Sequence, residues 1–129
     1  MMEVKKRVPR VIHFEIAADS PERAVKFYRE VFGWRIEKWA GPVDYWLVAT
    51  SEDKDVGING AITEKSDYVT ATTNTIGVVS FEDAVKKIIE AGGKQLMPKT
   101  AVPGIGYMTY CKDTEGNVFG IMQNDPSAK

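Results

Sequence analysis

The sequence contains one cysteine and one histidine among its 129 residues, and this scarcity excludes several kinds of site. Cys111 alone cannot form an intrachain disulfide or a Cys-rich zinc site. With His13 as the single histidine, the HExxH zinc motif and every other site that takes two imidazoles from one chain are excluded. Any chemistry that one chain performs therefore uses one histidine at most.

Long apolar runs and an excess of positive charge are also missing. No uninterrupted apolar run approaches the ~20 residues that cross a bilayer, and 17 basic against 18 acidic side chains give a net charge of −1. We therefore expect neither a membrane span nor a nucleic-acid partner. The small basic group formed by Lys5, Lys6, Arg7 and Arg10 is followed by no signal-peptide core, so we expect a cytoplasmic protein.

An internal repeat is the most informative pattern that the sequence does contain. Residues 20–26 match residues 80–86 at five of seven positions, at an offset of 60 residues. The same offset places Glu30 on Glu90 and Gly33 on Gly93. Because the flanking segments also repeat, we interpret the chain as two copies of one unit.

The first unit, residues 11–62, reads as a strand, a helix and three strands. Ser20 and Pro21 are typical of a helix start, and Gly33 of a helix end. The spacing between them predicts an apolar stripe that packs on a sheet, formed by Ala24, Phe27, Tyr28, Val31 and Phe32. The strands are expected at residues 11–17, 34–39, 45–50 and 57–62.

The second unit, residues 74–123, repeats this order. A strand at 75–79 precedes a helix capped by Ser80, with Asp83 at the capping-box position. Three strands are expected at 95–102, 107–112 and 118–123. The sequence thus predicts an α+β fold in which two tandem βαβββ units form one domain over residues 1–129. Curved mixed sheets would enclose a cavity for a small molecule, and their uncovered faces favour a homodimer.

Several stretches carry a resemblance to a known superfamily: residues 13–24 (HFEIAADSPERA), 27–34 (FYREVFGW) and 113–121 (DTEGNVFGI). From residue 11 to 123 the chain resembles the vicinal-oxygen-chelate superfamily of glyoxalase I, extradiol dioxygenases and bleomycin-resistance proteins. Residues 42–46, 57–61 and 97–107 are similar to a branch of predicted lactoylglutathione-lyase-related proteins. The resemblance implies the fold more specifically than it implies a reaction.

The resemblance also implies where a divalent ion would bind. Metal-dependent members take a His or Glu from the first and last strand of each unit. The matching positions here are His13, Gly60, Gly120 and one of Thr73, Asn74 and Thr75. With one good ligand of four, we expect no cofactor, no stoichiometric zinc, nickel or iron, and no glyoxalase I activity. The alternative is a divalent ion held by His13 and by ligands outside the family pattern.

Alternation along the first strand indicates which side chains line the cavity. If Phe14 and Ile16 pack under the helix, His13 and Glu15 face the cavity as a catalytic acid–base pair. The alternative is that His13 only bonds a neighbour and Glu15 lies at the wet rim. The other lining residues that we predict are Gly60, Thr75, Tyr107 and Gly120. The two glycines either enlarge the cavity or mark bulges in the sheet.

Six aromatic residues are expected near the mouth of the cavity, where they either stack on a ligand or fill the core: Trp34, Trp39, Tyr45, Trp46, Tyr107 and Tyr110. Two function classes then stay open. One is a lyase- or isomerase-like enzyme acting on a small carbonyl compound. The other is a protein that sequesters a small organic molecule, as bleomycin-resistance proteins do.

Overall fold

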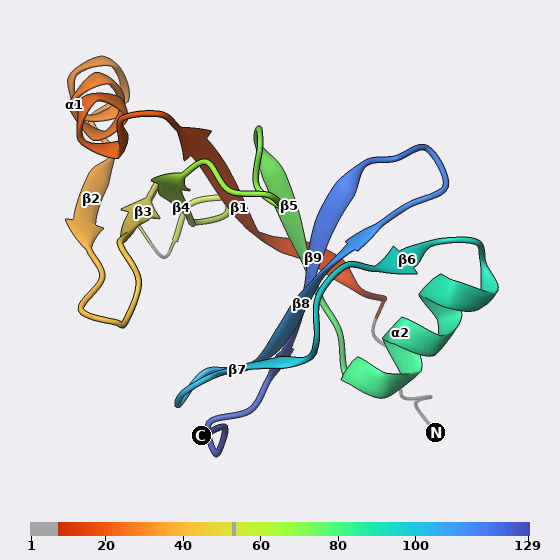
Figure 1. Cartoon of the computed structure of the whole chain (residues 1–129). Coiled ribbons are helices and arrows are strands. Elements are labelled where there is room, and N and C mark those ends of the chain that lie inside the picture. Colours follow the sequence, from red (N-terminus) through yellow and green to blue (C-terminus); the bar gives the residue numbers. More distant parts are fainter. Residues whose placement is uncertain (1–7, 53) are drawn as a thin grey trace.

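The computed structural model describes residues 8–52 and 54–129 (Figure 1). Of the basic group noted above, Lys5, Lys6 and Arg7 lie outside these residues. The first unit contains β1 (Arg10–Ala18), α1 (Pro21–Phe32), β2 (Arg35–Lys38), β3 (Tyr45–Ala49) and β4 (Gly60–Glu64). The second contains β5 (Thr73–Gly77), α2 (Phe81–Glu90), β6 (Lys94–Gln95), β7 (Thr100–Val102), β8 (Gly106–Lys112) and β9 (Val118–Asn124).

The α+β class and the two βαβββ units are confirmed, with one difference in the second unit. The strand expected at residues 95–102 is divided into β6 and β7, which pair with different parts of β8. Pro98 lies between them and has no N–H to donate to a ladder. Proline therefore interrupts the strand that the apolar pattern predicted as continuous.

All strands of the described chain join one mixed sheet in the order β2-β3-β4-β1-β5-β9-β8-β6, with β7 also paired to β8. The two units meet where β1 and β5 pair antiparallel, with Glu15 opposite Thr73 and His13 opposite Thr75. Phe14 lies opposite Asn74, its own counterpart in the repeat. The two copies are therefore related by an approximate two-fold axis at this pair.

The pairing also assigns side chains to the two faces of the sheet. Phe14 and Ile16 pack toward α1, against a core formed by Ala18, Val25, Ile36, Val48 and Ile62. We call this side the helix face. The opposite side, which we call the inner face, carries His13, Glu15, Thr73, Thr75 and Gly120. Figure 1 shows α1 and α2 at opposite ends of the sheet.

The apolar stripe predicted for α1 is covered only in part. The helix buries Val25, and Ala24 and Tyr28 contact the core. Phe27, Val31 and Phe32 stay 54–59% exposed, which corrects the expectation that the whole stripe packs on the sheet. Tyr28 instead stacks on Trp34 with 4.9 Å between ring centroids. The aromatic residues of this region thus pack on one another and leave an apolar surface open.

Neither helix of the described chain combines the length and the apolar character needed to cross a bilayer.

Candidate functional site

The candidate site lies on the inner face, at the centre of the sheet. Strand alternation places His13 and Glu15 on this face because Phe14 and Ile16 occupy the other. Glu15 is 5% exposed, whereas His13 is half-buried. Burying a carboxylate is costly unless hydrogen-bond donors surround it. The neighbours of Glu15 therefore decide what the site can do.

Two tyrosines complete the site from other strands. Tyr110 Oη on β8 donates to Glu15 Oε1 at 2.5 Å. His13 Nε2 and Tyr45 Oη on β3 are 2.7 Å apart. We call these four residues the Glu15 cluster: His13, Glu15, Tyr45 and Tyr110. The cluster takes residues from both units, and 95 positions of sequence separate Tyr110 from Glu15.

Burial and the charge of Glu15 set the ionisation of the cluster. Burial, followed by the nearby Glu15 carboxylate, raises the pKa of Tyr45 and of Tyr110 well above its ordinary value. Both phenols therefore stay protonated and able to donate. Burial lowers the pKa of His13 below 6.5, although the negative charge of Glu15 opposes this shift. The imidazole is thus neutral at pH 7.

Aromatic contacts hold the rings of the cluster in place. The His13 and Tyr45 rings are stacked at 6.2 Å between centroids, and Trp39 meets Tyr45 edge to face at 6.1 Å. Tyr68 stacks on Tyr110 at 5.7 Å. These contacts favour one orientation for each phenol, since stacked and edge-to-face pairs have preferred geometries.

Gly120 is the position that lets Tyr110 reach across the sheet. Tyr110 pairs with Gly120, which pairs with Thr75, which pairs with His13, so the four lie in one row of the inner face. A Cβ at position 120 would lie 2.9 Å from Thr75 Oγ1. Because Gly120 has no side chain, nothing at this position covers the sheet surface between Tyr110 and β1.

Gly60 does not match Gly120, although the two are repeat equivalents. β1 pairs Phe14 with Gly60, but β5 pairs Thr75 with Gly120, which is a one-residue shift in the repeat. Such a shift moves a position to the other face. A Cβ at Gly60 would lie 2.4 Å from the Phe14 carbonyl oxygen. A side chain at position 60 would therefore lie on the helix face, yet the backbone of Gly60 is part of the wall of the hollow beside His13, and Gly120 is not.

That hollow has a volume of about 300 Å³ and opens beside the Glu15 cluster. His13 is the cluster residue that lines it, and the other lining residues are Arg35, Glu37, Leu47, Val48, Ala49, Asn59 and Gly60. A second hollow of about 400 Å³, between the end of β1 and α1, has no residue of the cluster in its wall. Of these two hollows, the first is therefore the one that brings a ligand to the Glu15 cluster.

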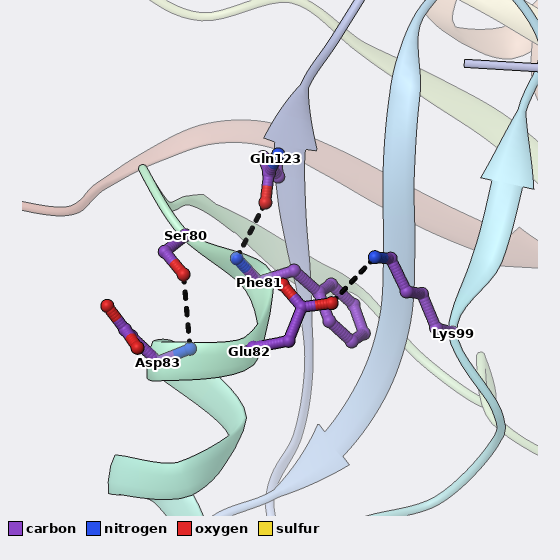
Figure 2. A network of polar contacts seen from close by, with 6 residues as sticks. All are labelled: Ser80, Phe81, Glu82, Asp83, Lys99 and Gln123. Carbon is purple, nitrogen blue, oxygen red and sulfur yellow. Dashed lines mark hydrogen bonds and ion pairs between the residues drawn. The ribbon is translucent and has the colours of Figure 1, made fainter.

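Tyr107 does not lie with His13, which corrects the prediction for this residue. It shares a face with Thr109 and Cys111, both fully buried, and this is the helix face. Lys99 Nζ lies 4.5 Å from the Tyr107 ring centroid and 2.6 Å from Glu82 at the start of α2. Figure 2 shows Lys99 against Glu82 and the Phe81 ring, on the same side of the sheet as α2. The prediction placed Thr109 and Cys111 on the inner face and therefore selected Tyr107, whereas the tyrosine of β8 on the inner face is Tyr110.

The residues that sequence reasoning did not single out are Tyr45 and Tyr110. Both belong to the predicted group of aromatics near the mouth, but nothing in that group distinguished ligand-facing from core residues. The alternation of side chains along β8 could have identified Tyr110, because Tyr110 faces away from its buried neighbour Cys111. Thr75 and Gly120, by contrast, lie in the same row as His13, as their pairing shows.

The donor set does not fit the divalent ion that the superfamily implies. In the row that contains His13, the next residues are Thr75, which offers a hydroxyl, and Gly120, which offers no side chain. Within residues 8–52 and 54–129, no group of three or more His, Cys, Asp or Glu side chains is placed to hold a metal ion. Three or four such donors are the usual requirement for a zinc site. No step of the chemistry below is therefore assigned to a metal.

Comparisons with known proteins agree on the family. A family model described as Glyoxalase/Bleomycin resistance protein/Dioxygenase superfamily matches residues 10–121. A "Glyoxylase-like domain-containing protein" of Didymella fabae is 27% identical over 112 residues, which cover 83% of this chain and 88% of that protein.

Solved structures share the fold at low sequence identity. Hypothetical protein BH1468 from Bacillus halodurans C-125 superposes with a TM-score of 0.70 at 14% identity, covering 95% of this chain and 99% of that one. A methylmalonyl-CoA epimerase in complex with methylmalonyl-CoA and NH4+ gives 0.68 at 15% identity, with the same coverage. At these identities the likeness establishes the fold alone. The family model, which matches most of the chain, shows that the chain belongs to the Glyoxalase/Bleomycin resistance protein/Dioxygenase superfamily.

Proposed function

We propose that this protein binds a small organic carbonyl compound in the hollow beside His13 and catalyses a proton transfer on it. The observation that carries the proposal is a half-buried, neutral imidazole that lines the hollow, contacts Tyr45 and shares the inner face with the buried carboxylate of Glu15. A neutral imidazole near neutral pH is the usual general base of enzymes.

In this reaction His13 takes a proton from the carbon next to the carbonyl group. The electron pair of the broken C–H bond stays on the substrate as an enolate, and His13 becomes an imidazolium. The negative charge of Glu15 favours that imidazolium, since it raises the pKa of His13. Return of the proton to the same or another carbon releases an isomer and the neutral imidazole. Arg35 and Asn59 line the hollow and supply donors for the enolate oxygen.

The exchange of substrate protons with solvent tests this proposal directly. We would incubate the protein in D2O with methylmalonyl-CoA, the ligand of one structural relative, and with the methylglyoxal–glutathione hemithioacetal. Loss of the proton next to the carbonyl is followed by NMR. We expect exchange with at least one compound of this class, and a fall of about 10²- to 10⁴-fold in His13→Gln. Tyr107→Phe, on the helix face, is the matched control and should keep the rate.

Binding without catalysis is the second candidate. The rings of Tyr45 and Trp39 beside His13 favour it, because aromatic faces hold apolar and planar ligands without any reaction. Quenching of tryptophan fluorescence by a compound that shows no exchange would support this candidate. An exchange rate that His13→Gln leaves unchanged would contradict the catalytic proposal.

We also propose that the protein is a homodimer. Phe27, Val31 and Phe32 form an open apolar surface on α1, and Leu47 beside the hollow is 43% exposed. Apolar surface of this kind is typical of a protein–protein interface. Sedimentation at micromolar concentration should give twice the mass of the chain. A monomer under those conditions would contradict the proposal.

A further inference from the structure

The segment that connects the two units, residues 65–72 between β4 and β5, brings an aromatic ring to the Glu15 cluster. The ring of Tyr68 stacks on the ring of Tyr110, with 5.7 Å between centroids and 17° between planes. Tyr110 in turn donates to the buried carboxylate of Glu15. The connecting segment therefore contacts the cluster on the inner face, although it lies between the strands that carry the other residues of the site.

Local hydrogen bonds fix the backbone around Tyr68. The Ser66 N–H donates to the Val69 carbonyl oxygen at 3.0 Å. Ser66 Oγ accepts from the N–H groups of Tyr68 and Val69 at 3.3 and 3.0 Å. Val69 is 3% exposed in a segment whose other residues, apart from the half-buried Tyr68, are exposed. The turn and its one buried side chain therefore hold Tyr68 in place against the sheet.

Tyr110 lacks support from the strand beside it. It pairs with Gly120 in the row of the inner face, and this glycine has no side chain to pack against the phenol ring. Tyr110 crosses the position of Gly120 to reach Glu15, at 2.5 Å between the two oxygens. A side chain occupies several staggered rotamers unless its neighbours exclude the others. The stacked ring of Tyr68 supplies the packing that β9 does not.

The bond between Tyr110 and Glu15 also depends on the exclusion of water. Glu15 is 5% exposed, and a hydrogen bond to a charged acceptor is stronger where the surroundings are dry. Burial raises the pKa of Tyr110, so its hydroxyl stays protonated and donates at neutral pH. The ring of Tyr68 covers one face of this phenol and limits the access of water from that side.

We propose that Tyr68 is a positioning residue, which holds Tyr110 on Glu15 and keeps water from the bond between them. The connecting segment then completes a site that takes Glu15 from the first unit and Tyr110 from the second. The inference deepens the proposed function and rests on it for its effect on catalysis. The contacts themselves belong to the protein without a ligand, and they are tested first in that state.

The hydroxyl proton of Tyr110 reports on this bond. In 1H NMR spectra recorded in water, a phenol proton held on a buried carboxylate is shifted downfield and exchanges slowly with solvent. Its resonance is assigned by its absence from Tyr110→Phe. We expect Tyr68→Leu, which keeps apolar volume but removes the ring, to accelerate this exchange by about 2- to 12-fold, the factor that corresponds to one aromatic pair. Tyr68→Phe retains the ring and should keep the wild-type rate.

A matched control separates this effect from a general loss of stability. Tyr28 is also a stacked tyrosine, 4.9 Å from Trp34 between centroids, but it packs on the helix face. Tyr28→Leu should lower the free energy of unfolding without accelerating exchange of the Tyr110 proton. If Tyr68→Leu does not fold, Ser66→Ala takes its place and should accelerate the exchange, because it removes the acceptor of the turn and leaves every ring in the chain.

The substrate exchange assay gives a second readout. Tyr68 is not among the residues that line the hollow beside His13, so Tyr68→Leu should leave KM unchanged. It should lower kcat, because water that reaches Glu15 screens the charge that favours the His13 imidazolium. A raised KM with an unchanged kcat would make Tyr68 a binding residue and would contradict the positioning role.

The NMR experiment decides the inference. It is overturned if the wild-type protein shows no slowly exchanging Tyr110 proton, or if Tyr68→Leu (or Ser66→Ala in its place) exchanges at the wild-type rate. Equal acceleration in the Tyr28→Leu control would also overturn it, because exchange would then follow global unfolding. A protected proton that Tyr68→Leu releases, in a protein that exchanges no substrate proton, would count against the proposed function alone.

Discussion

The two βαβββ units share one scaffold but differ in chemistry. In the first unit the central strand carries His13 and Glu15, and at the equivalent positions the second unit has Thr73 and Thr75. The second unit contributes Tyr110 instead, which reaches Glu15 from β8. The duplicated fold thus supplies two halves of a sheet, and the cluster is asymmetric across it. Sequence repetition predicts the scaffold; the departures from repetition mark the site.

The two helices differ in the same way. Ser80 Oγ accepts from the Asp83 N–H at 3.2 Å, and Gln123 Oε1 accepts from the Phe81 N–H at 2.7 Å, so α2 is fixed to the sheet at its first turn (Figure 2). The side chain of Ser20 makes no such bond to α1. The helix whose first turn is capped by side chains therefore belongs to the unit without the titratable pair.

The largest expected difference between the units concerns their equivalent glycines. Gly60→Ala places a Cβ against backbone, so we expect a loss of about 3 kcal/mol or more in the free energy of unfolding. Gly120→Ala meets the Thr75 hydroxyl, which can rotate away, and should cost about 1 kcal/mol. Urea unfolding measures both. Equal losses would contradict the one-residue shift that places the two glycines on opposite faces.

The next effect concerns the tyrosine that links the units. Tyr110→Phe removes the donor to a buried carboxylate, and we expect a loss of about 2 kcal/mol at pH 7. Tyr107→Phe is the matched control, because it keeps its ring beside Lys99 and should change stability by less than about 0.5 kcal/mol. If both variants unfold at the same urea concentration, the Tyr110–Glu15 bond does not stabilise the fold.

A smaller effect is expected at the helix starts. Ser80→Ala removes a cap that accepts a backbone hydrogen bond and should cost about 1 kcal/mol. Ser20→Ala removes no such bond, so we expect a change of only a few tenths of a kcal/mol. Thermal unfolding of the two variants, side by side, gives the comparison. The opposite order would show that α1 is the better-capped helix in solution.

The smallest effect is a dependence of stability on pH that comes from His13. Burial places its folded-state pKa below 6.5, so the unfolded chain binds more protons in the window between the two values. The contribution of His13 to the free energy of unfolding is fully present above pH 6.5. It decreases as the pH falls through that window. His13→Gln should flatten the curve there, while leaving the decline at more acidic pH that follows from carboxylate protonation. An unchanged curve would contradict the burial of this imidazole.

Much of the fold was predictable, because the signals that define it are local. Helix caps at Ser20 and Ser80, the 60-residue offset and the turn glycines indicate the units without any tertiary information. The division of β6 from β7 was also accessible through Pro98, but the apolar pattern outweighed it.

The site was predictable only in part. Alternation identified the face shared by His13 and Glu15, because the apolar residues of β1 had one helix to pack under. It could not decide the face of β8, where both Tyr107 and Tyr110 alternate with residues that could be buried. The one-residue register shift between β1–β4 and β5–β9 is a tertiary property, and no sequence pattern distinguished Gly60 from Gly120.

The central claim is that the site is assembled across the two units by the bond between Tyr110 and Glu15. A double-mutant cycle with Tyr110→Phe and Glu15→Gln, followed by urea unfolding at pH 7, measures that coupling directly. A hydrogen bond to a buried charge predicts a coupling free energy of about 1.5–3 kcal/mol. If the losses of the two single variants sum to the loss of the double variant within about 0.5 kcal/mol, the claim is contradicted.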